Sequence, residues 1–551
     1  MNSSRKLVYS FGVFVFDLNQ GQSCEFCFPD DALSATDRKA ISMLCFPDSQ
    51  SASNSGNFES VYTFSYRVIE PVQNSGSLRS NAEKESCSVE FLQCYVYFRQ
   101  VEDALSSRGY HQKSFVLMSS WSRSFSCADE MLRLSRRIGN KFYLAEERGC
   151  GKDVLIDAYG HVQEYGIIHE QSAASMDLGT GLSSMTMRSL EIPLSPKSSG
   201  RLGKIFDELY SLLSGLWHVW ESLLAGLPIL VHYPGSADMC SRAVLALPSL
   251  IFPIRYAGDV RPFLSIFDSD YSYFRSLPGQ LPCIVGVTSP MALEQLANSF
   301  SIVINFSVEE DSCFLQSSKF VLISASPTAR MYLSETVTSI SSNTRTRLGS
   351  LGLRFSYSAP DSAIYRLALP SDAECVSKRL VTGLQDLSGS QLNRALIQRH
   401  FNLLTRDFLV PFLQFVETDS SRINSEYLFA CSPKVQEFSP PKFLESLLSW
   451  GGIGRHLSTI SKEKLGGLYR RFISSETFRD WLSEAQERAN FEALIAHAEL
   501  LVRSMTRDKV VWMSLSERER GMHRVAQLLE VVPEEQVELR LKLSDTMALL
   551  N

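Results

Sequence analysis

Between residues 202 and 306 the chain alternates helical and buried-strand patterns, which strongly limits the folds open to it. A helical pattern from Leu202 to about Gly226 precedes the apolar run Pro228–Val231, and Ser236 to Leu247 is helical again. This alternation is typical of an α/β layer with largely parallel strands. Further predicted elements are an extended stretch at Ile251–Tyr256, strands at Phe263–Phe267, Cys283–Val287 and Ile302–Phe306, and a helix at Pro290–Asn298.

The first 120 residues are rich in predicted strands. Residues 7–17 and Glu25–Phe28 flank a turn at Asn19–Gly21, which predicts a hairpin. Strands are also expected at Val61–Val68, Val89–Arg99 and Ser114–Ser119, so this part is interpreted as a strand-rich α/β domain. From 122 to 195 the apolar periods become irregular, and we interpret this segment as a linker or diverged peripheral lobe.

The pattern turns helical after about residue 370. Apolar residues follow three-four spacing over Leu392–Val416, where Pro411 is expected to kink or end the helix. Two amphipathic helices broken at Pro533 are expected near the end. The predicted fold class is therefore α/β plus all-α, divided into 1–121, 122–195, a central α/β domain at 196–335, a mostly helical domain at 336–485, and C-terminal amphipathic helices at 486–551.

Composition gives no overall support to a nucleic acid or membrane partner, so any membrane attachment must be local or come from a partner. The formal net charge is −6, so no global positive field favours nucleic acid or an anionic bilayer. The best candidate for a membrane span, Leu209–Tyr233, contains His218, Glu221 and Pro228, and is better interpreted as a buried helix followed by a strand. No transmembrane segment is expected. The 12 scattered cysteines are interpreted as reduced thiols of a cytoplasmic protein.

Motifs for covalent chemistry, metal binding and cofactor binding are absent from the sequence. Gly200–Lys204 lacks the spacing and the hydroxyl of a phosphate-binding loop. Cys24 and Cys27 have CxxC spacing, but no second pair completes a zinc site. We therefore expect no catalytic side chain, no metal and no cofactor, which favours a protein that works by binding another protein.

Several ordered sequence blocks between 216 and 290 carry a family resemblance. They read Leu216–Glu221, Leu227–Val231, Ala243–Leu247, Pro253–Tyr256, Asp259–Pro262 and Cys283–Pro290. In this order they resemble the central segment of DENN proteins, specifically the sixth branch of that family. Upstream, Tyr97–Asp103 and Arg108–Leu117 are similar to the same family, as are Arg399–Phe401, Leu409–Pro411 and Gly467–Phe472 downstream.

The resemblance implies a longin-like upstream domain, a central α/β DENN domain and a helical downstream DENN domain. Members of this family bind the switch regions of Rab GTPases and release GDP. The function it implies is guanine-nucleotide exchange on a Rab GTPase in vesicle traffic. Such a protein is expected to be cytoplasmic, with peripheral recruitment to endosomal or Golgi membranes.

Three segments are candidates for GTPase contact by their position in the resemblance. They are Arg99 at a strand end, the turn Ser106–Gln112, and the loop that holds Asp259, Arg261 and Pro262. Each has a structural alternative: Arg99 can be a solvated charge, and Asp259 with Arg261 can be a local ion pair that braces a turn.

Two other activities remain open. Some DENN-type proteins act as GTPase activators through an arginine finger, and Arg108 occupies the corresponding turn. A non-catalytic Rab effector or scaffold is the other alternative, in which the C-terminal helices dock through Val525, Leu528, Leu529 and Val532, unless this face simply packs inside the protein.

Overall fold

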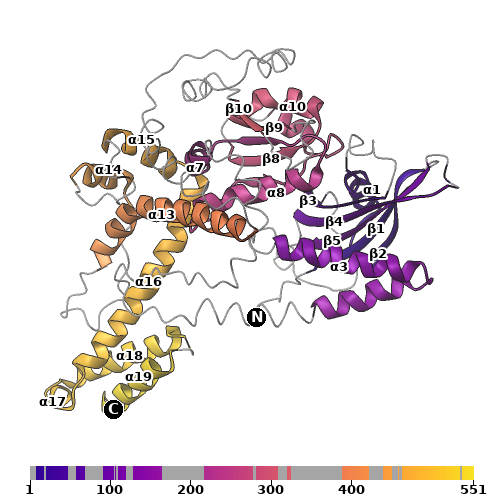
Figure 1. Cartoon of the computed structure of the whole chain (residues 1–551). Coiled ribbons are helices and arrows are strands. Elements are labelled where there is room, and N and C mark those ends of the chain that lie inside the picture. Colours follow the sequence, from indigo (N-terminus) through magenta and orange to yellow (C-terminus); the bar gives the residue numbers. More distant parts are fainter. Residues whose placement is uncertain are drawn as a thin grey trace. The chain divides into compact units, whose positions relative to one another are not determined.

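The computed structural model describes residues 8–17, 20–47, 57–68, 91–104, 106, 109–119, 128–163, 216–276, 281–307, 319–323, 387–420, 438–449, 457, 462–533 and 536–550. The chain divides into two compact units (Figure 1). The first holds residues up to Asn402 apart from two short segments, and the second runs chiefly from Leu403 to the C-terminus.

The first unit contains an antiparallel sheet of five strands in the order β2-β1-β5-β4-β3. The predicted hairpin is confirmed as β1 and β2. Both faces of the sheet are apolar: Phe115 and Leu117 of β5 face one core, while Val116 and Met118 face the other. The strands are β1 Ser10–Asp17, β2 Gly21–Phe28, β3 Phe58–Arg67, β4 Phe91–Glu102 and β5 Tyr110–Ser119.

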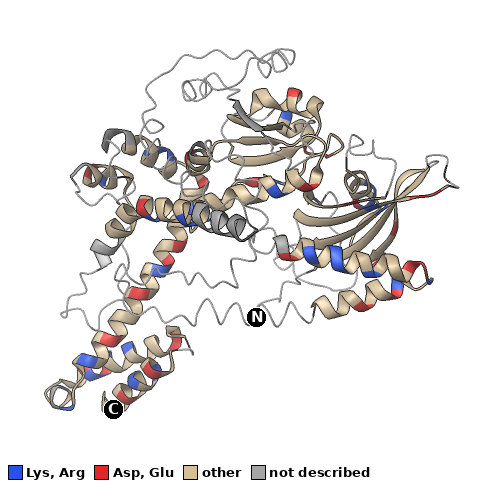
Figure 2. Cartoon of the chain, in the orientation of Figure 1, with Lys and Arg blue, Asp and Glu red and all other residues tan. Residues whose placement is uncertain are grey.

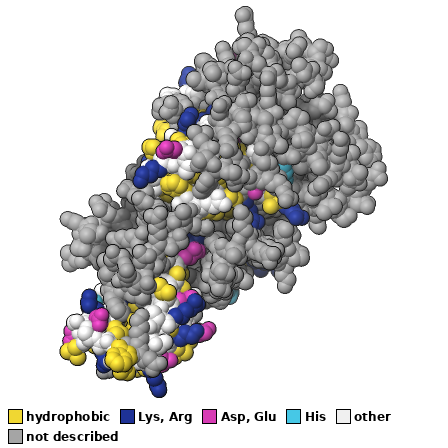
Figure 3. Space-filling view, turned by 90° about the vertical axis from the view of Figure 1, so that its left-hand side faces the viewer, with side chains coloured by type: hydrophobic (Ala, Val, Ile, Leu, Met, Phe, Trp, Pro, Cys, Tyr) yellow, Lys and Arg dark blue, Asp and Glu magenta, His cyan; other side chains and the backbone are white. Residues whose placement is uncertain are grey.

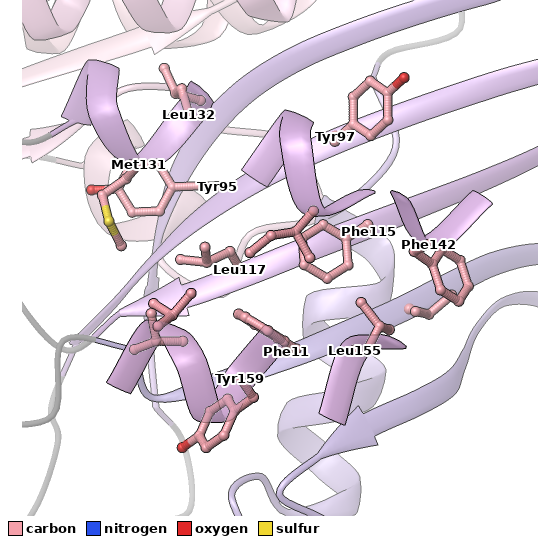
Figure 4. Packing of buried hydrophobic residues seen from close by; sticks show 14 of the residues in the cluster. Phe11, Tyr95, Tyr97, Phe115, Leu117, Met131, Leu132, Phe142, Leu155 and Tyr159 are labelled. Carbon is pink, nitrogen blue, oxygen red and sulfur yellow. The ribbon is translucent and has the colours of Figure 1, made fainter. Parts of the chain in front are cut away.

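Helices cover both faces of this sheet. On one face, α1 (Ala35–Leu44) begins at the N-cap Ser34, whose hydroxyl accepts from the Asp37 amide. On the other face lie α3 (Ala128–Glu146) and a helix over residues 151–163, packed as Figure 4 shows. Residues 128–163 therefore form a layer of the first domain, whereas the sequence predicted a linker or peripheral lobe over 122–195. Residues 164–195 lie outside the described chain.

Small polar residues on the packed face of α3 explain this difference. The Ser135 hydroxyl donates to the Tyr95 carbonyl at 2.8 Å, and both groups are buried. A Cβ at Gly139 would lie 2.4 Å from the Tyr97 ring, so glycine is needed where α3 crosses the sheet. Because Ser and Gly interrupt the apolar stripe, the amphipathic period is weak in the sequence.

The second sheet has the order β10-β9-β6-β8-β7. Four strands, β7, β8, β6 and β9, run parallel to one another, and β10 pairs antiparallel with β9. The expected α/β layer with largely parallel strands is thus confirmed. The strands are β6 Ile229–His232, β7 Asp259–Arg261, β8 Cys283–Val287, β9 Ile302–Ser307 and β10 Lys319–Ile323.

Two predictions for this layer, one extended stretch and one strand, are wrong. The 3-10 helix η4 (Leu247–Ile251) precedes an irregular segment where an extended stretch was expected, and Phe263–Phe267 is a loop that follows the short strand β7. The loop is apolar because it bridges two cores: Phe263 packs with the first sheet and Leu264 with the second. Because successive residues of this loop are buried in different cores, its apolar sequence resembles that of a buried strand.

The helices of the second layer are α7 Leu216–Ala225, α8 Ala237–Ala246, α9 Tyr271–Arg275 and α10 Pro290–Leu296. Helix α8 lies between the two sheets of the first unit (Figure 1), since Ala237 packs in a first-sheet core while the Cys240 thiol lies 3.6 Å from the Val287 carbonyl of β8. The segment considered for a membrane span contains α7 and β6. No described helix is both long and apolar enough to cross a membrane.

The second unit is helical in its described part. Helix α13 continues through Pro411 to Ser420, so the expectation that this proline ends the helix is wrong, and α16 runs without a break across the predicted boundary at 485. The expected break at Pro533 is confirmed. The helices are α13 Leu387–Ser420, α14 Pro440–Ser449, α15 Lys462–Ile473, α16 Glu476–Ser504, α17 Arg507–Val511, α18 Leu515–Val531 and α19 Val537–Leu550.

An aromatic cluster forms the core around Phe412 of α13. Its ring lies 4.2 Å from that of Phe443 and is stacked on it, and 5.3 Å from Tyr469 and from Phe478. A second core joins α16, α18 and α19. It buries Val525, Leu528 and Val532, so these three residues of the predicted docking face are used for internal packing.

Candidate functional site

Arg261 of β7 lies where the two sheets of the first unit meet. Its side chain is only 1% exposed. The guanidinium donates from Nε to both oxygens of Asp259, at 2.9 and 3.0 Å, and from Nη2 to Asp270 at 2.7 Å. A third donor, Nη1, reaches the Ser65 carbonyl of β3 at 3.3 Å. Arg261 therefore joins β7 to the first sheet and to the start of α9.

Other side chains add to this contact between β7 and the first sheet. We call the group of residues around Arg261 the joint. Arg67, at the end of β3, forms an ion pair with Asp270 at 3.3 Å, and the Ser65 hydroxyl donates to the Val260 carbonyl at 3.0 Å. Both guanidinium groups lie 4.9 Å from the centre of the Phe91 ring. The structural alternative for Asp259 and Arg261, a local ion pair, is present. Arg261 and the buried Pro262 offer almost no surface to a partner.

Asp268 adds a third carboxyl group to the joint. It is buried, and its Oδ1 accepts from the Asp270 amide at 2.8 Å. Burial raises the pKa of Asp268 to about 6, although the Asp270 amide and the Arg261 charge lower it. The folded chain therefore binds a proton at Asp268 more tightly than the unfolded chain does.

We expect Asp268 to make stability depend on pH. Between about pH 4 and pH 6 the folded state binds more protons than the unfolded state, so the free energy of unfolding falls as pH rises, by about 2–3 kcal/mol. Replacing Asp268 with asparagine should raise the melting temperature at pH 7.5 and change it little at pH 4. Thermal unfolding at both pH values tests this, with exposed Asp153→Asn as the control. Equal shifts for Asp268→Asn at the two pH values would contradict the assignment.

A pocket of about 400 Å³ lies at the end of the first sheet that is opposite to Arg261. The turn between β4 and β5 forms part of its wall: the Asp103 amide donates to the Gly109 carbonyl at 2.9 Å, and Gly109 has a φ of 77°. The lining residues are Val15, Phe16, Asp17, Glu25, Asp103, Ser106, Tyr110, His111, Gln112 and Lys113. The pocket thus includes much of the predicted contact turn Ser106–Gln112.

Lys113 is the buried cation of this pocket. Its ammonium group lies 2.9 Å from Glu25 and also pairs with Glu146 of α3. Burial lowers the pKa of Lys113, but the hydrogen bonds with Glu146 and Glu25 outweigh it, so the pKa is raised overall. The pocket lining holds the carboxyl groups of Asp17, Glu25 and Asp103 and the single ammonium group of Lys113, so acidic groups outnumber basic ones in it.

Arg99 lies beside this pocket on β4. Its cross-strand neighbours are Glu59 and Lys113, and its guanidinium is 5.4 Å from the centre of the Tyr143 ring of α3. The side chain is half-buried, so part of it remains accessible. It is neither a fully solvated charge nor a buried one.

The structure separates the predicted contact residues into two groups. Arg261 lies beside Phe91 at the start of β4, whereas Arg99 of the same strand lies beside the pocket. Phe91 and Arg99 are eight residues apart, a distance of about 27 Å along the strand at about 3.4 Å per residue. Arg108 lies outside the described residues. A third feature, the acidic pocket itself, was not predicted; its residues come from β1, β2, β5 and the β4–β5 turn, which only the strand order brings together.

Neither group of residues has the geometry of a covalent active site. Within the described part of the chain, no cluster of three or more His, Cys, Asp or Glu side chains could hold a metal ion. Burial raises the pKa of the Cys27 thiol to about 12, so it is a poor nucleophile at neutral pH. The accessible features are a polar pocket and a half-buried arginine, both suited to binding another protein.

Comparison with known proteins finds relatives that cover most of the chain. No family model matches the chain. It is 27% identical over 514 residues to Protein DENND6B of Homo sapiens, covering 89% of this chain and 80% of that protein. It is 25% identical to Protein DENND6A of Mus musculus (90% and 79%) and 24% identical to the Protein DENND6 homolog of Dictyostelium discoideum (92% and 73%). These similarities support a DENN protein of the DENND6 type.

Proposed function

We propose that this protein is a guanine-nucleotide exchange factor for a Rab-family GTPase. The observation that carries the proposal is its similarity to DENND6 proteins over about nine-tenths of its length. DENN proteins as a family suggest Rab GTPases as partners. An exchange factor binds the nucleotide-free GTPase more tightly than the nucleotide-bound form, so it needs no nucleophile of its own.

The first sheet supports a longin-like upstream domain within this proposal. Its five antiparallel strands, with α1 on one face and two helices on the other, form three layers over the described residues between 8 and 163. We propose that the central DENN domain holds the second sheet and that the downstream domain begins with α13. A continuous α16 argues against a separate C-terminal domain starting at 486.

We further propose that the pocket end of the first sheet contacts the GTPase. Three observations support this choice: the pocket is open, its lining holds more acidic than basic groups, and Arg99 and the exposed Val101 lie beside it on β4. Arg261 then has a different role, because it holds the second layer against the first sheet and touches no partner.

Replacing Arg99 with alanine is expected to lower the rate of GDP release from the cognate Rab by at least about ten-fold, which corresponds to about 1.4 kcal/mol of lost binding. The rate is measured with fluorescent GDP and excess unlabelled GTP. The control is Arg479→Ala, an arginine of α16 that is 70% exposed. If both variants kept the full rate, the pocket end would not be the contact surface.

The assay also separates exchange from the opposite activity. If GDP release were unchanged but GTP hydrolysis rose, and Arg108→Ala abolished the rise, the protein would be a GTPase activator with an arginine finger. An effector would instead bind the GTP form stably and change neither rate.

A further inference from the structure

The turn between α17 and α18 carries three neighbouring apolar side chains that are almost fully exposed. Val511 is 70% exposed, Trp512 is 88% exposed and Leu515 is 77% exposed. Scattered exposed apolar residues are normal on a protein surface, but a tryptophan and two aliphatic residues within five positions form a patch. We call these three residues the apolar tip.

The apolar tip is held by ordered contacts. Val510 and Met505 are buried beneath it in the core of α16, α18 and α19. The Arg518 guanidinium donates to the Val510 carbonyl at 3.1 Å, and Ser514 and Glu517 form a capping box at the start of α18. The tip is therefore presented on a fixed turn, which leads into α18 at the capping box of Ser514 and Glu517.

The charge around the apolar tip is opposite in sign to that of the whole chain. Residues 503–520 contain five basic and three acidic residues, whereas the chain has a formal net charge of −6. Arg503, Arg507 and Arg520 are exposed. In the lower part of Figure 3, hydrophobic side chains lie beside Lys and Arg on the described surface of these last helices, and Figure 2 shows charges of both signs along them.

We propose that the apolar tip and its arginines bind an anionic lipid surface. Tryptophan is favoured at the boundary between lipid headgroups and hydrocarbon, where its ring is apolar and its N–H remains hydrated. Arginine guanidinium groups pair with lipid phosphates and carboxylates at the same depth. Val511 and Leu515 would enter the membrane beside the Trp512 ring.

The small size of the tip argues against a protein partner. A stable interface between proteins needs about 800 Å² and about 20 residues from each side, and the three side chains of the tip are far fewer. Insertion of a few apolar side chains, assisted by basic neighbours, is sufficient for reversible membrane binding. An anionic bilayer is thus the occupant that fits both the size of the tip and its charge.

The test is co-sedimentation of the full chain with phosphatidylcholine vesicles that contain or lack phosphatidylserine. We expect at least about ten-fold stronger binding to the anionic vesicles, falling as salt is raised. Trp512→Ser should remove most of this binding without a change in melting temperature, since the side chain is 88% exposed. The control Leu541→Ser changes an apolar residue of α19 that is 61% exposed and should bind as the parent does.

Three results would overturn the proposal. They are equal binding to both kinds of vesicle, unchanged binding by Trp512→Ser, or a concentration-dependent dimer that Trp512→Ser abolishes in the absence of vesicle binding. The last result would assign the tip to a second copy of the chain. Nucleotide exchange on a soluble GTPase is measured without vesicles, so failure here leaves the exchange activity unaffected.

Discussion

Replacing Arg261 with alanine should destabilise the first unit by about 3–5 kcal/mol. The guanidinium is 1% exposed and satisfies Asp259, Asp270 and the Ser65 carbonyl, so its removal leaves carboxylates that are partly buried without their cation. Lysine at this position should recover only part of the loss, because an ammonium group cannot reach three acceptors in the fork geometry of arginine.

Urea unfolding and hydrogen exchange measure this effect. Amides of β3, β4 and β7 should exchange faster in Arg261→Ala, while those of the second unit should be unchanged. Arg136→Ala is the matched control, because Arg136 and Glu59 form an ion pair in the same unit whose side chains are 60% and 40% exposed; it should cost less than about 1 kcal/mol. If Arg261→Ala lowered the free energy of unfolding as little as Arg136→Ala does, the joint would not hold the two layers together.

Replacing Phe412 with alanine should destabilise the second unit by about 3–5 kcal/mol. The side chain is fully buried in α13, and five of the aromatic rings around it belong to α14, α15 and α16. Neighbouring rings are rigid and cannot close the space that a missing phenyl group leaves, so both transfer and cavity costs apply.

The loss is measured by urea unfolding, with hydrogen exchange to locate it in α13 to α16. The control is Phe491→Ala on α16, which is 38% exposed and should cost much less. If Phe412→Ala and Phe491→Ala had equal costs, the aromatic cluster would not be the main core of this unit.

Regular periods in the sequence were enough to predict most elements. The alternation in β1 and β3 and the three-four spacing of α13 each gave a strand or helix at the observed place. The prediction failed where packing, and not period, decides the structure. Ser135 and Gly139 weaken the apolar stripe of α3, and Phe263 and Leu264 look like a strand because the loop contacts two cores.

Individual candidate residues could be predicted from the sequence, but their positions relative to one another in the fold could not. Sequence blocks placed Arg99 and Asp259 among the candidates, and nothing local shows that they belong to opposite ends of the first sheet. That separation follows from β7 docking beside Ser65 and Phe91, a contact between residues almost 200 positions apart. The acidic pocket likewise depends on the strand order β2-β1-β5, which periodicity cannot reveal.

The most direct test of the central claim is release of fluorescent GDP from a panel of Rab GTPases, with excess unlabelled GTP, in the presence and absence of this protein. We expect rapid release from one or a few Rabs and a slow rate with the others, with no added cofactor. If every Rab in a panel shown to be competent by a known exchange factor kept its intrinsic rate, exchange activity would be contradicted.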